Sequence, residues 1–169
     1  ELKKIKKIFN NSFINAVDLI LNCKGKVIFA GIGKSGLIAR KLSATFSSVG
    51  IPSFFCDPAQ ALHGDMGQIE RKDILIIFSY SGNTSELNNM LKYGNRYRIK
   101  IIGVASKPDS VLLKASDVKL ILPKVKESDI TGMVPTSSTS MTLLLGDCLA
   151  TTVMYKKKFS KEKFKIFHP

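Results

Sequence analysis

The sequence lacks any run of roughly 18 apolar residues, and it shows no charged-then-apolar leader with a small-residue cleavage site. We therefore expect a soluble protein with neither a membrane span nor a signal peptide. Cysteine is scarce as well: the three cysteines show no C-x-x-C spacing and leave one over, which favours a reducing compartment over a disulfide framework. The expected location is the cytoplasm.

Histidine occurs only twice, so one subunit cannot supply a three-histidine metal site. Acidic residues are also few, with 13 against 26 basic ones and a net charge of +13. Ten of the basic residues lie near the two ends, and residues 8–155 carry 16 basic and 11 acidic residues. This central part shows no arginine cluster and no alternation of basic with aromatic residues, so we expect no nucleic acid partner. Its modest positive charge would favour small anionic substrates.

Short apolar segments alternate with amphipathic ones along the chain. An amphipathic helix is predicted at residues 2–21, with lysines on its outer face. Strands are then predicted at 26–30, 53–56, 74–79, 100–105 and 118–122, and helices at 35–49, 85–97, 110–115 and 137–155. Strands that are apolar throughout and separated by helices indicate a parallel sheet covered on both faces. We expect one α/β domain over residues 1–169, a three-layer doubly wound sandwich around a five-stranded parallel sheet of flavodoxin-like order 2-1-3-4-5.

The stretch AGIGKSG, residues 30–36, follows the first predicted strand and opens a helix. It is not a Walker A loop, because the first glycine of that motif would fall on Ile28 inside the strand. The dinucleotide pattern G-x-G-x-x-G does fit as Gly31, Gly33 and Gly36, and Asp57 lies where a ribose-binding acid would belong. A general anion site, in which the N–H groups of a helix start bind a phosphate, fits as well and needs a second such loop to confirm it.

A second loop, SYSGNTSE at residues 79–86, supplies four hydroxyl groups at the end of the third predicted strand. Such donors can hold a phosphate, since each charge-assisted hydrogen bond contributes about 1.5–3 kcal/mol. The simpler alternative is a turn in which Thr84 or Ser85 is the N-cap. Strands one and three are neighbours in the expected sheet, so this serine loop would face the glycine loop. A third cluster, PTSSTS at residues 135–140, fits helix capping and ligand contact equally.

Four motifs in this order and spacing resemble those of the arabinose-5-phosphate isomerase family of sugar isomerase (SIS) domains: GIGKSG, PSFFCDPAQALHGDMGQI, SYSGNTSE and VPTSSTS. The resemblance covers essentially the whole chain. It implies interconversion of ribulose 5-phosphate and arabinose 5-phosphate, the entry to the 3-deoxy-octulosonate of lipopolysaccharide, with no redox cofactor. It also implies a homo-oligomer, a dimer or tetramer with sites at subunit interfaces, and a pair of CBS domains in the parent protein after this point.

The same resemblance implies a catalytic set and a set of substrate contacts. The catalytic set is Lys34, Glu86, Glu127 and His168, and the contacts are Gly33, Ser35, Gly50, Ile51, His63, Ser79, Ser81, Gly82, Asn83, Thr84, Ser138 and Thr139. Close relatives carry a zinc-binding histidine where this chain has Asp57, so we assign no metal site.

The chemistry of an aldose–ketose isomerase requires a base, a donor to the enediolate oxygen and a proton shuttle. As a hypothesis, one of Glu86 and Glu127 is the base, Lys34 polarises the carbonyl oxygen, and His168 assists ring opening or proton relay. Two other functions fit parts of the sequence. A phosphosugar-sensing SIS module without activity would carry a helix-turn-helix domain upstream, for which residues 2–21 are too short. A dinucleotide-binding dehydrogenase fits the glycines, but Lys34 and the serine loop favour a phosphosugar.

Overall fold

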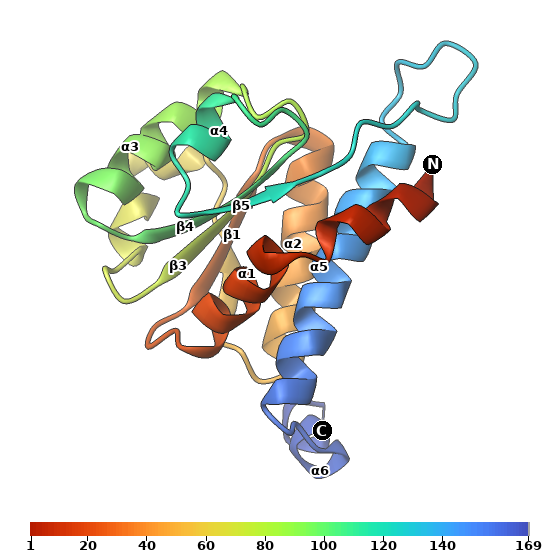
Figure 1. Ribbon diagram of the computed structural model, residues 1–169. Coiled ribbons are helices and arrows are strands. Elements are labelled where there is room, and N and C mark those ends of the chain that lie inside the picture. Colours follow the sequence, from red (N-terminus) through yellow and green to blue (C-terminus); the bar gives the residue numbers. More distant parts are fainter. Residues whose placement is uncertain (169) are drawn as a thin grey trace.

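The computed structural model describes residues 1–168, and its five strands form one parallel sheet in the order β2-β1-β3-β4-β5 (Figure 1). The strands are β1 (Val27–Gly31), β2 (Ser53–Phe55), β3 (Ile74–Phe78), β4 (Lys100–Ala105) and β5 (Val118–Ile121). Each crossover between parallel neighbours passes through at least one helix, as this arrangement requires. The predicted α/β sandwich and its strand order are confirmed.

The helices lie on both sides of the sheet. The α-helices are α1 (Asn11–Leu21), α2 (Gly33–Ser48), α3 (Asn88–Arg96), α4 (Val111–Lys114), α5 (Ser137–Lys156) and α6 (Lys161–Phe167). Four short 3₁₀-helices complete the set: η1 (Leu2–Ile8), η2 (Gln60–His63), η3 (Asp65–Gln68) and η4 (Ser85–Leu87). In Figure 1, α1, α2 and α5 cover one face of the sheet, and α3 and α4 cover the other.

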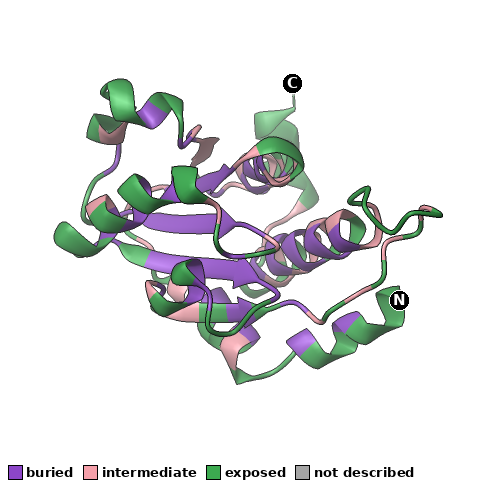
Figure 2. Ribbon diagram, turned by 90° about the horizontal axis from the view of Figure 1, so that it is seen from above, coloured by how far each residue is buried: buried purple, intermediate pink, exposed green. Residues whose placement is uncertain are grey.

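Alternate residues of the central strands build two separate cores. Ile76 and Phe78 of β3 face the core that includes α1, α2 and α5, while Leu75 and Ile77 face α3 and α4. Because both faces are covered, every residue of β1 and β3 is buried, and these strands run through the centre of the molecule in Figure 2. Strands buried on both faces read as continuous apolar runs, which is why the sequence revealed them.

The N-terminal region departs from prediction. A single helix over residues 2–21 is wrong, because the chain forms η1 and α1 with a break at Phe9 and Asn10. Asn10 adopts an extended conformation, and its side-chain oxygen accepts a hydrogen bond from the Ser12 N–H at 2.9 Å. An asparagine that caps a new helix in this way ends the preceding one. The apolar spacing still identified residues that face the core, since Ile5 and Ile8 are buried.

The distribution of arginine also departs from prediction. The chain has four arginines, and three of them, Arg71, Arg96 and Arg98, line one surface hollow together with two tyrosines. The expectation that the central part has no arginine cluster and no mixture of basic and aromatic residues is therefore wrong. The fold brings Arg71 to the end of α3, although it is distant in sequence from the other two.

The strands β1 and β3 end at the same level of the sheet. Gly31 pairs with Phe78 in the parallel register, so the segments that follow these two strands leave the sheet side by side. The α5 helix starts at the same edge, where the chain returns from β5. Within residues 1–168, the structure has no helix with the length and apolar character needed to span a membrane.

Candidate active site

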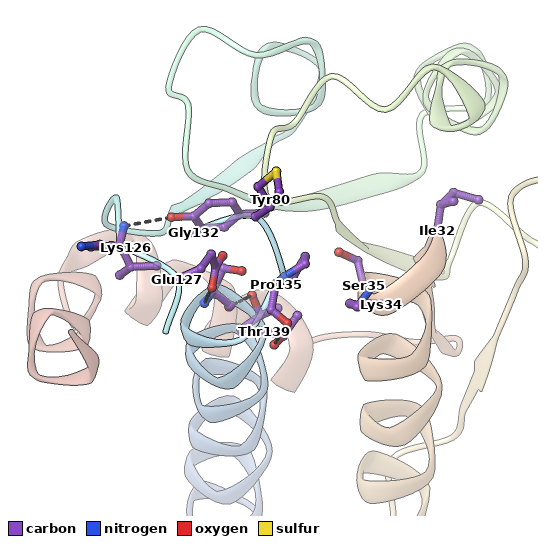
Figure 3. Close-up of a pocket in the computed structure, with 13 residues that line it drawn as sticks. Ile32, Lys34, Ser35, Tyr80, Lys126, Glu127, Gly132, Pro135 and Thr139 are labelled. Atoms are coloured by element: carbon purple, nitrogen blue, oxygen red, sulfur yellow. Dashed lines mark hydrogen bonds between the residues drawn. The ribbon is translucent and has the colours of Figure 1, made fainter. Parts of the chain in front are cut away.

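A pocket of about 550 Å³ lies at the carboxyl edge of the sheet, between the first turns of α2 and α5 (Figure 3). We call it the candidate pocket. Figure 3 shows Lys34 and Ser35 at the start of α2, Glu127 and Thr139 beside the start of α5, and Tyr80 above the space between them. The lining residues are Ile32, Lys34, Ser35, Tyr80, Val125, Lys126, Glu127, Gly132, Met133, Pro135, Ser138, Thr139 and Thr142.

The start of α2 favours a negatively charged ligand. Its N-cap, Ile32, provides no side-chain hydrogen bond, and the first turn contains no acidic residue. The N–H groups of this turn are therefore available at the positive end of the helix dipole. Lys34 adds an ammonium group and Ser35 a hydroxyl at the same place. This combination can bind a phosphate or stabilise an oxyanion.

Glu127 caps the start of α5. Its Oε2 accepts hydrogen bonds from the Thr136 N–H at 2.8 Å, the Thr136 hydroxyl at 3.2 Å and the Ser138 N–H at 3.2 Å. Burial alone would raise the pKa of Glu127, but the hydrogen bonds from Ser138 and Thr136 together outweigh it and hold the pKa below its usual value. Glu127 is therefore a carboxylate at neutral pH. The hydrogen bonds all end on Oε2, so Oε1 is the oxygen that can act on a ligand.

Tyr80 connects the serine loop to the segment that carries Glu127. Its hydroxyl accepts a hydrogen bond from the Val125 N–H at 3.0 Å and donates one to the Pro123 carbonyl at 3.4 Å. These contacts hold the chain after β5 above the candidate pocket. Farther along, the Asp129 carboxylate accepts hydrogen bonds from the N–H groups of Met133 and Val134 at 3.3 and 3.0 Å. These bonds fix the loop that closes one side of the candidate pocket. The sequence reading missed Tyr80, although it stands in the middle of the serine motif.

The hydroxyls of the serine loop mainly hold the loop itself. The Ser79 and Thr84 hydroxyls share a hydrogen bond of 2.7 Å, and the Gly82 N–H donates to the Ser79 oxygen at 3.0 Å. The Asn83 side-chain oxygen accepts from the Val111 N–H at 3.0 Å and so caps α4. Of this loop, only Tyr80 lines the candidate pocket. The loop geometry is thus set by its own polar side chains before any ligand is present.

The chain also matches a known protein family. The model of the family described as SIS domain matches residues 20–152, which include both loops and most of α5. The chain belongs to the SIS domain family. The resemblance found in the sequence motifs is therefore confirmed.

Curated proteins are similar to this SIS domain over nearly its whole length. It is 40% identical to the arabinose 5-phosphate isomerase KdsD of Escherichia coli O157:H7 over 168 residues, which is 99% of this chain and 51% of that protein. It is 43% identical to an uncharacterized protein of Rickettsia prowazekii over 159 residues, covering 94% of this chain and 50% of that protein. The chain thus spans about half the length of the curated relatives it matches.

Solved structures share the fold closely. An Escherichia coli CFT073 protein in complex with arabinose 5-phosphate superposes with a TM-score of 0.93 at 36% identity, covering 99% of this chain and 91% of that one. A Listeria monocytogenes protein described as a putative sugar-phosphate isomerase gives a TM-score of 0.92 at 34% identity, over 95% and 84% of the two chains.

The candidate pocket of the SIS domain brings together some of the residues named from sequence. Those that line it are Lys34, Ser35, Glu127, Ser138 and Thr139. Those that do not line it are Gly33, Gly50, Ile51, His63, Ser79, Ser81, Gly82, Asn83, Thr84, Glu86 and His168. Glu86 is exposed and accepts a hydrogen bond from the Ser85 hydroxyl at 2.8 Å. Its own backbone N–H, followed by that hydroxyl, lowers the pKa of Glu86.

Three of the residues outside the candidate pocket lie far from it within one subunit. Gly50 and Ile51 follow the end of α2, whereas the pocket lies at its start. His168 ends α6, beyond the far end of α5, where its ring stacks on Phe164 at 3.8 Å between centroids. Since α5 has 20 residues, it separates His168 from the pocket by about 30 Å. Their predicted contact with substrate would require a second subunit.

The Asp57 carboxylate forms hydrogen bonds with the backbone that follows it. Its Oδ1 accepts hydrogen bonds from the N–H groups of Ala59 and Gln60 at 2.9 and 3.4 Å, which starts the turn leading to η2. Asp57 also lines a smaller hollow of about 270 Å³ together with Gly33 and Arg40. Across residues 1–168, no group of three or more His, Cys, Asp or Glu side chains is arranged to hold a metal ion.

Proposed function

We propose that this chain is the catalytic SIS domain of an aldose–ketose isomerase that interconverts D-ribulose 5-phosphate and D-arabinose 5-phosphate. The observation that carries the proposal is the candidate pocket, which presents an ammonium group and an ionised carboxylate beside two helix starts. Additional support comes from relatives named arabinose 5-phosphate isomerase at about 40% identity and from a similar structure in complex with arabinose 5-phosphate.

The proposed chemistry proceeds through an enediolate. Glu127 Oε1 removes the proton from C2 of open-chain arabinose 5-phosphate, and the electron pair moves to the aldehyde oxygen. The Lys34 ammonium and the N–H groups of α2 stabilise the negative charge on that oxygen. The proton then returns to C1, and transfer of the O2 proton to O1 leaves the carbonyl at C2. Glu127 is the stronger candidate for the base, because it shares the pocket with Lys34 and Glu86 does not.

We also propose that subunits complete one another's sites. His168 lies too far from the candidate pocket of its own subunit to relay a proton there, so a partner subunit would supply it. Mixing two inactive variants, Lys34→Ala and His168→Ala, tests this arrangement. In a randomly mixed dimer, half the molecules are hybrids with one intact site, which restores about a quarter of the wild-type activity. If mixing and subunit exchange restore no activity, His168 does not act across an interface.

The proposed reaction would also have a role in lipopolysaccharide synthesis. Arabinose 5-phosphate made by this domain would supply 3-deoxy-octulosonate for lipopolysaccharide in the cytoplasm. The parent protein would carry a CBS pair after this domain, consistent with curated relatives about twice as long as this chain.

The decisive experiment uses ribulose 5-phosphate in deuterated water, followed by proton NMR. We expect arabinose 5-phosphate with deuterium at C2, because the base exchanges its proton with solvent before reprotonation. The Lys34→Ala variant is the matched control and should give little labelled product. Recovery of unlabelled ribulose 5-phosphate by the wild-type chain, together with saturable binding of the sugar, would reject the isomerase and support a phosphosugar-sensing module.

A further inference from the structure

A second hollow, of about 330 Å³, lies at the edge of the sheet opposite the candidate pocket. It forms where the end of α3 meets the segments that lead into β3 and β4. We call it the arginine hollow, and its lining residues are Ile69, Arg71, Tyr93, Arg96, Tyr97 and Arg98. Because β3 and β4 start at this edge and end near the candidate pocket, the two sites are roughly 15–20 Å apart.

The arginines of this hollow are not neutralised by the fold. Among residues 1–168, none of the three forms an ion pair with a carboxylate. Two acids stand close by in sequence, but both are already paired with lysines. Glu70 lies 3.0 Å from the Lys72 ammonium and 3.5 Å from that of Lys26, and Asp73 lies 3.5 Å from Lys26. The guanidinium groups therefore remain available for an anion from outside the chain.

Arg98 occupies a backbone position that usually belongs to glycine. The Ile99 N–H bonds to the Gly94 carbonyl at 2.8 Å and the Arg98 N–H to the Asn95 carbonyl at 3.2 Å, which is the Schellman pattern at the end of α3. In this pattern Arg98 takes the left-handed conformation, with φ of 56°. A side chain there costs about 1–2 kcal/mol relative to glycine. An arginine is thus retained at a position where local structure disfavours it.

Two tyrosines form an aromatic wall beside the arginines, with their rings tilted by 46° to each other. The rings of Tyr93 and Tyr97 lie 4.6 Å apart, and the Arg96 guanidinium lies 5.8 Å from the centre of the Tyr97 ring. Tyr97 is 49% exposed. On the other side of this wall a hollow of about 310 Å³ continues along the surface, where Leu62 and Met66 add apolar contacts. Charged donors and an apolar aromatic surface are therefore adjacent.

The helix dipole explains only part of this cluster. A basic residue in the last turn of a helix interacts favourably with the negative end of the dipole, and Arg96 holds that position. Arg71 precedes β3, however, and is not part of α3. The dipole also gives no reason for the two tyrosines. An anionic ligand with a flat ring accounts for all of these features together.

We propose that the arginine hollow binds a nucleoside phosphate. The phosphate accepts hydrogen bonds from the guanidinium groups of Arg71, Arg96 and Arg98, whose planar donors suit phosphate oxygens. The base lies against the aromatic wall of Tyr93 and Tyr97, where Tyr97 is half exposed. The volume of about 330 Å³ is near the lower end for small-molecule pockets and fits one nucleotide rather than a polymer. This site is separate from the proposed isomerase chemistry and does not depend on it.

The test is isothermal titration calorimetry of the whole chain with AMP, adenosine and inorganic phosphate as separate probes. We expect saturable binding of AMP that is at least about tenfold tighter than that of either fragment, since each fragment engages only one half of the site. The double variant Arg71→Gln/Arg98→Asn should weaken AMP binding at least about tenfold, and asparagine keeps the left-handed turn. Tyr97→Leu should weaken AMP binding but leave that of phosphate unchanged.

Two matched variants locate the binding. Lys161→Gln/Lys163→Gln removes the same charge from α6, and Lys34→Ala alters the candidate pocket; neither should change AMP affinity. The proposal is overturned if AMP shows no saturable binding up to about 1 mM, which corresponds to only about 4 kcal/mol. It is also overturned if phosphate binds to the Lys34→Ala variant as tightly as AMP does, or if Lys34→Ala alone abolishes the AMP signal. Much tighter binding of single-stranded oligoadenylate than of AMP would replace it with a nucleic acid surface.

Discussion

Gly82 offers the sharpest test of how the serine loop is built. It has a φ of 70°, and a Cβ there would lie 2.1 Å from the Ser110 hydroxyl oxygen and 2.4 Å from the Ser110 Cβ. Gly132 has nearly the same φ, 68°, but a Cβ there would meet nothing within 4 Å. Replacing each glycine by alanine therefore imposes the same backbone cost, and only Gly82→Ala adds a collision.

The two costs can be estimated separately. The left-handed conformation costs alanine about 1–2 kcal/mol, and overpacking adds about 1–3 kcal/mol. Gly82→Ala should therefore lower the free energy of unfolding by about 2–5 kcal/mol, and Gly132→Ala by about 1–2 kcal/mol. In a domain of this size each kcal/mol lowers Tm by about 2–4 °C, so the Gly82→Ala variant should melt about 4–20 °C lower.

Scanning calorimetry of both variants measures the difference, and a third variant identifies its source. Adding Ser110→Gly to Gly82→Ala removes the colliding atoms and should restore part of the lost stability, once the effect of Ser110→Gly alone is subtracted. The explanation by close packing would be refuted if Gly82→Ala and Gly132→Ala lowered the free energy of unfolding equally. It would also be refuted if the effects of Gly82→Ala and Ser110→Gly were simply additive.

Three further predictions concern single side chains. Lys34→Ala and Glu127→Gln should each lower kcat by about 10²–10⁴ while circular dichroism stays unchanged; near wild-type rates in both would reject their catalytic roles. Thr136→Val removes one hydrogen bond that lowers the pKa of Glu127, so that pKa should rise. Because the base must be deprotonated, the acid limb of kcat/KM then moves to higher pH, and an unmoved limb assigns it to another group. Asp73 is buried and accepts the Lys26 N–H at 2.7 Å, so Asp73→Asn should cost about 1.5–3 kcal/mol in urea unfolding; a smaller loss would mean that its charge is dispensable.

The sheet could be predicted because its strands carry an unambiguous signal. Segments such as β3, apolar at every position, can only lie between two covered faces, and their alternation with helices indicates a parallel sheet. The strand order was expected from the flavodoxin-like arrangement, which is one of the common orders of such sheets. The break at Asn10 was harder, because the apolar spacing continues across it and only the local hydrogen bond to Ser12 ends the helix. Helix α6 was missed, because the last predicted helix ends at residue 155 and no helix was predicted after it.

The candidate site was only partly predictable for a different reason. Lys34 stands in the glycine loop, whereas Glu127 was named only through the family resemblance. The role of Tyr80 depends on where the chain after β5 passes, which no local pattern encodes. The arginine hollow shows the same limit. The segment that contains Arg96 and Arg98 mixes basic and aromatic residues visibly, yet Arg71 joins them only through the packing of the sheet.

The hydrogen bonds around Glu127 have a consequence for the evolution of this domain. One carboxylate both caps α5 and, in our proposal, takes the proton from the sugar. Selection for protein abundance and selection for turnover therefore act on the same side chain. A deep mutational scan should find this position intolerant in both screens, whereas Lys34, which supports no helix in this way, should be intolerant only in the growth screen that depends on activity.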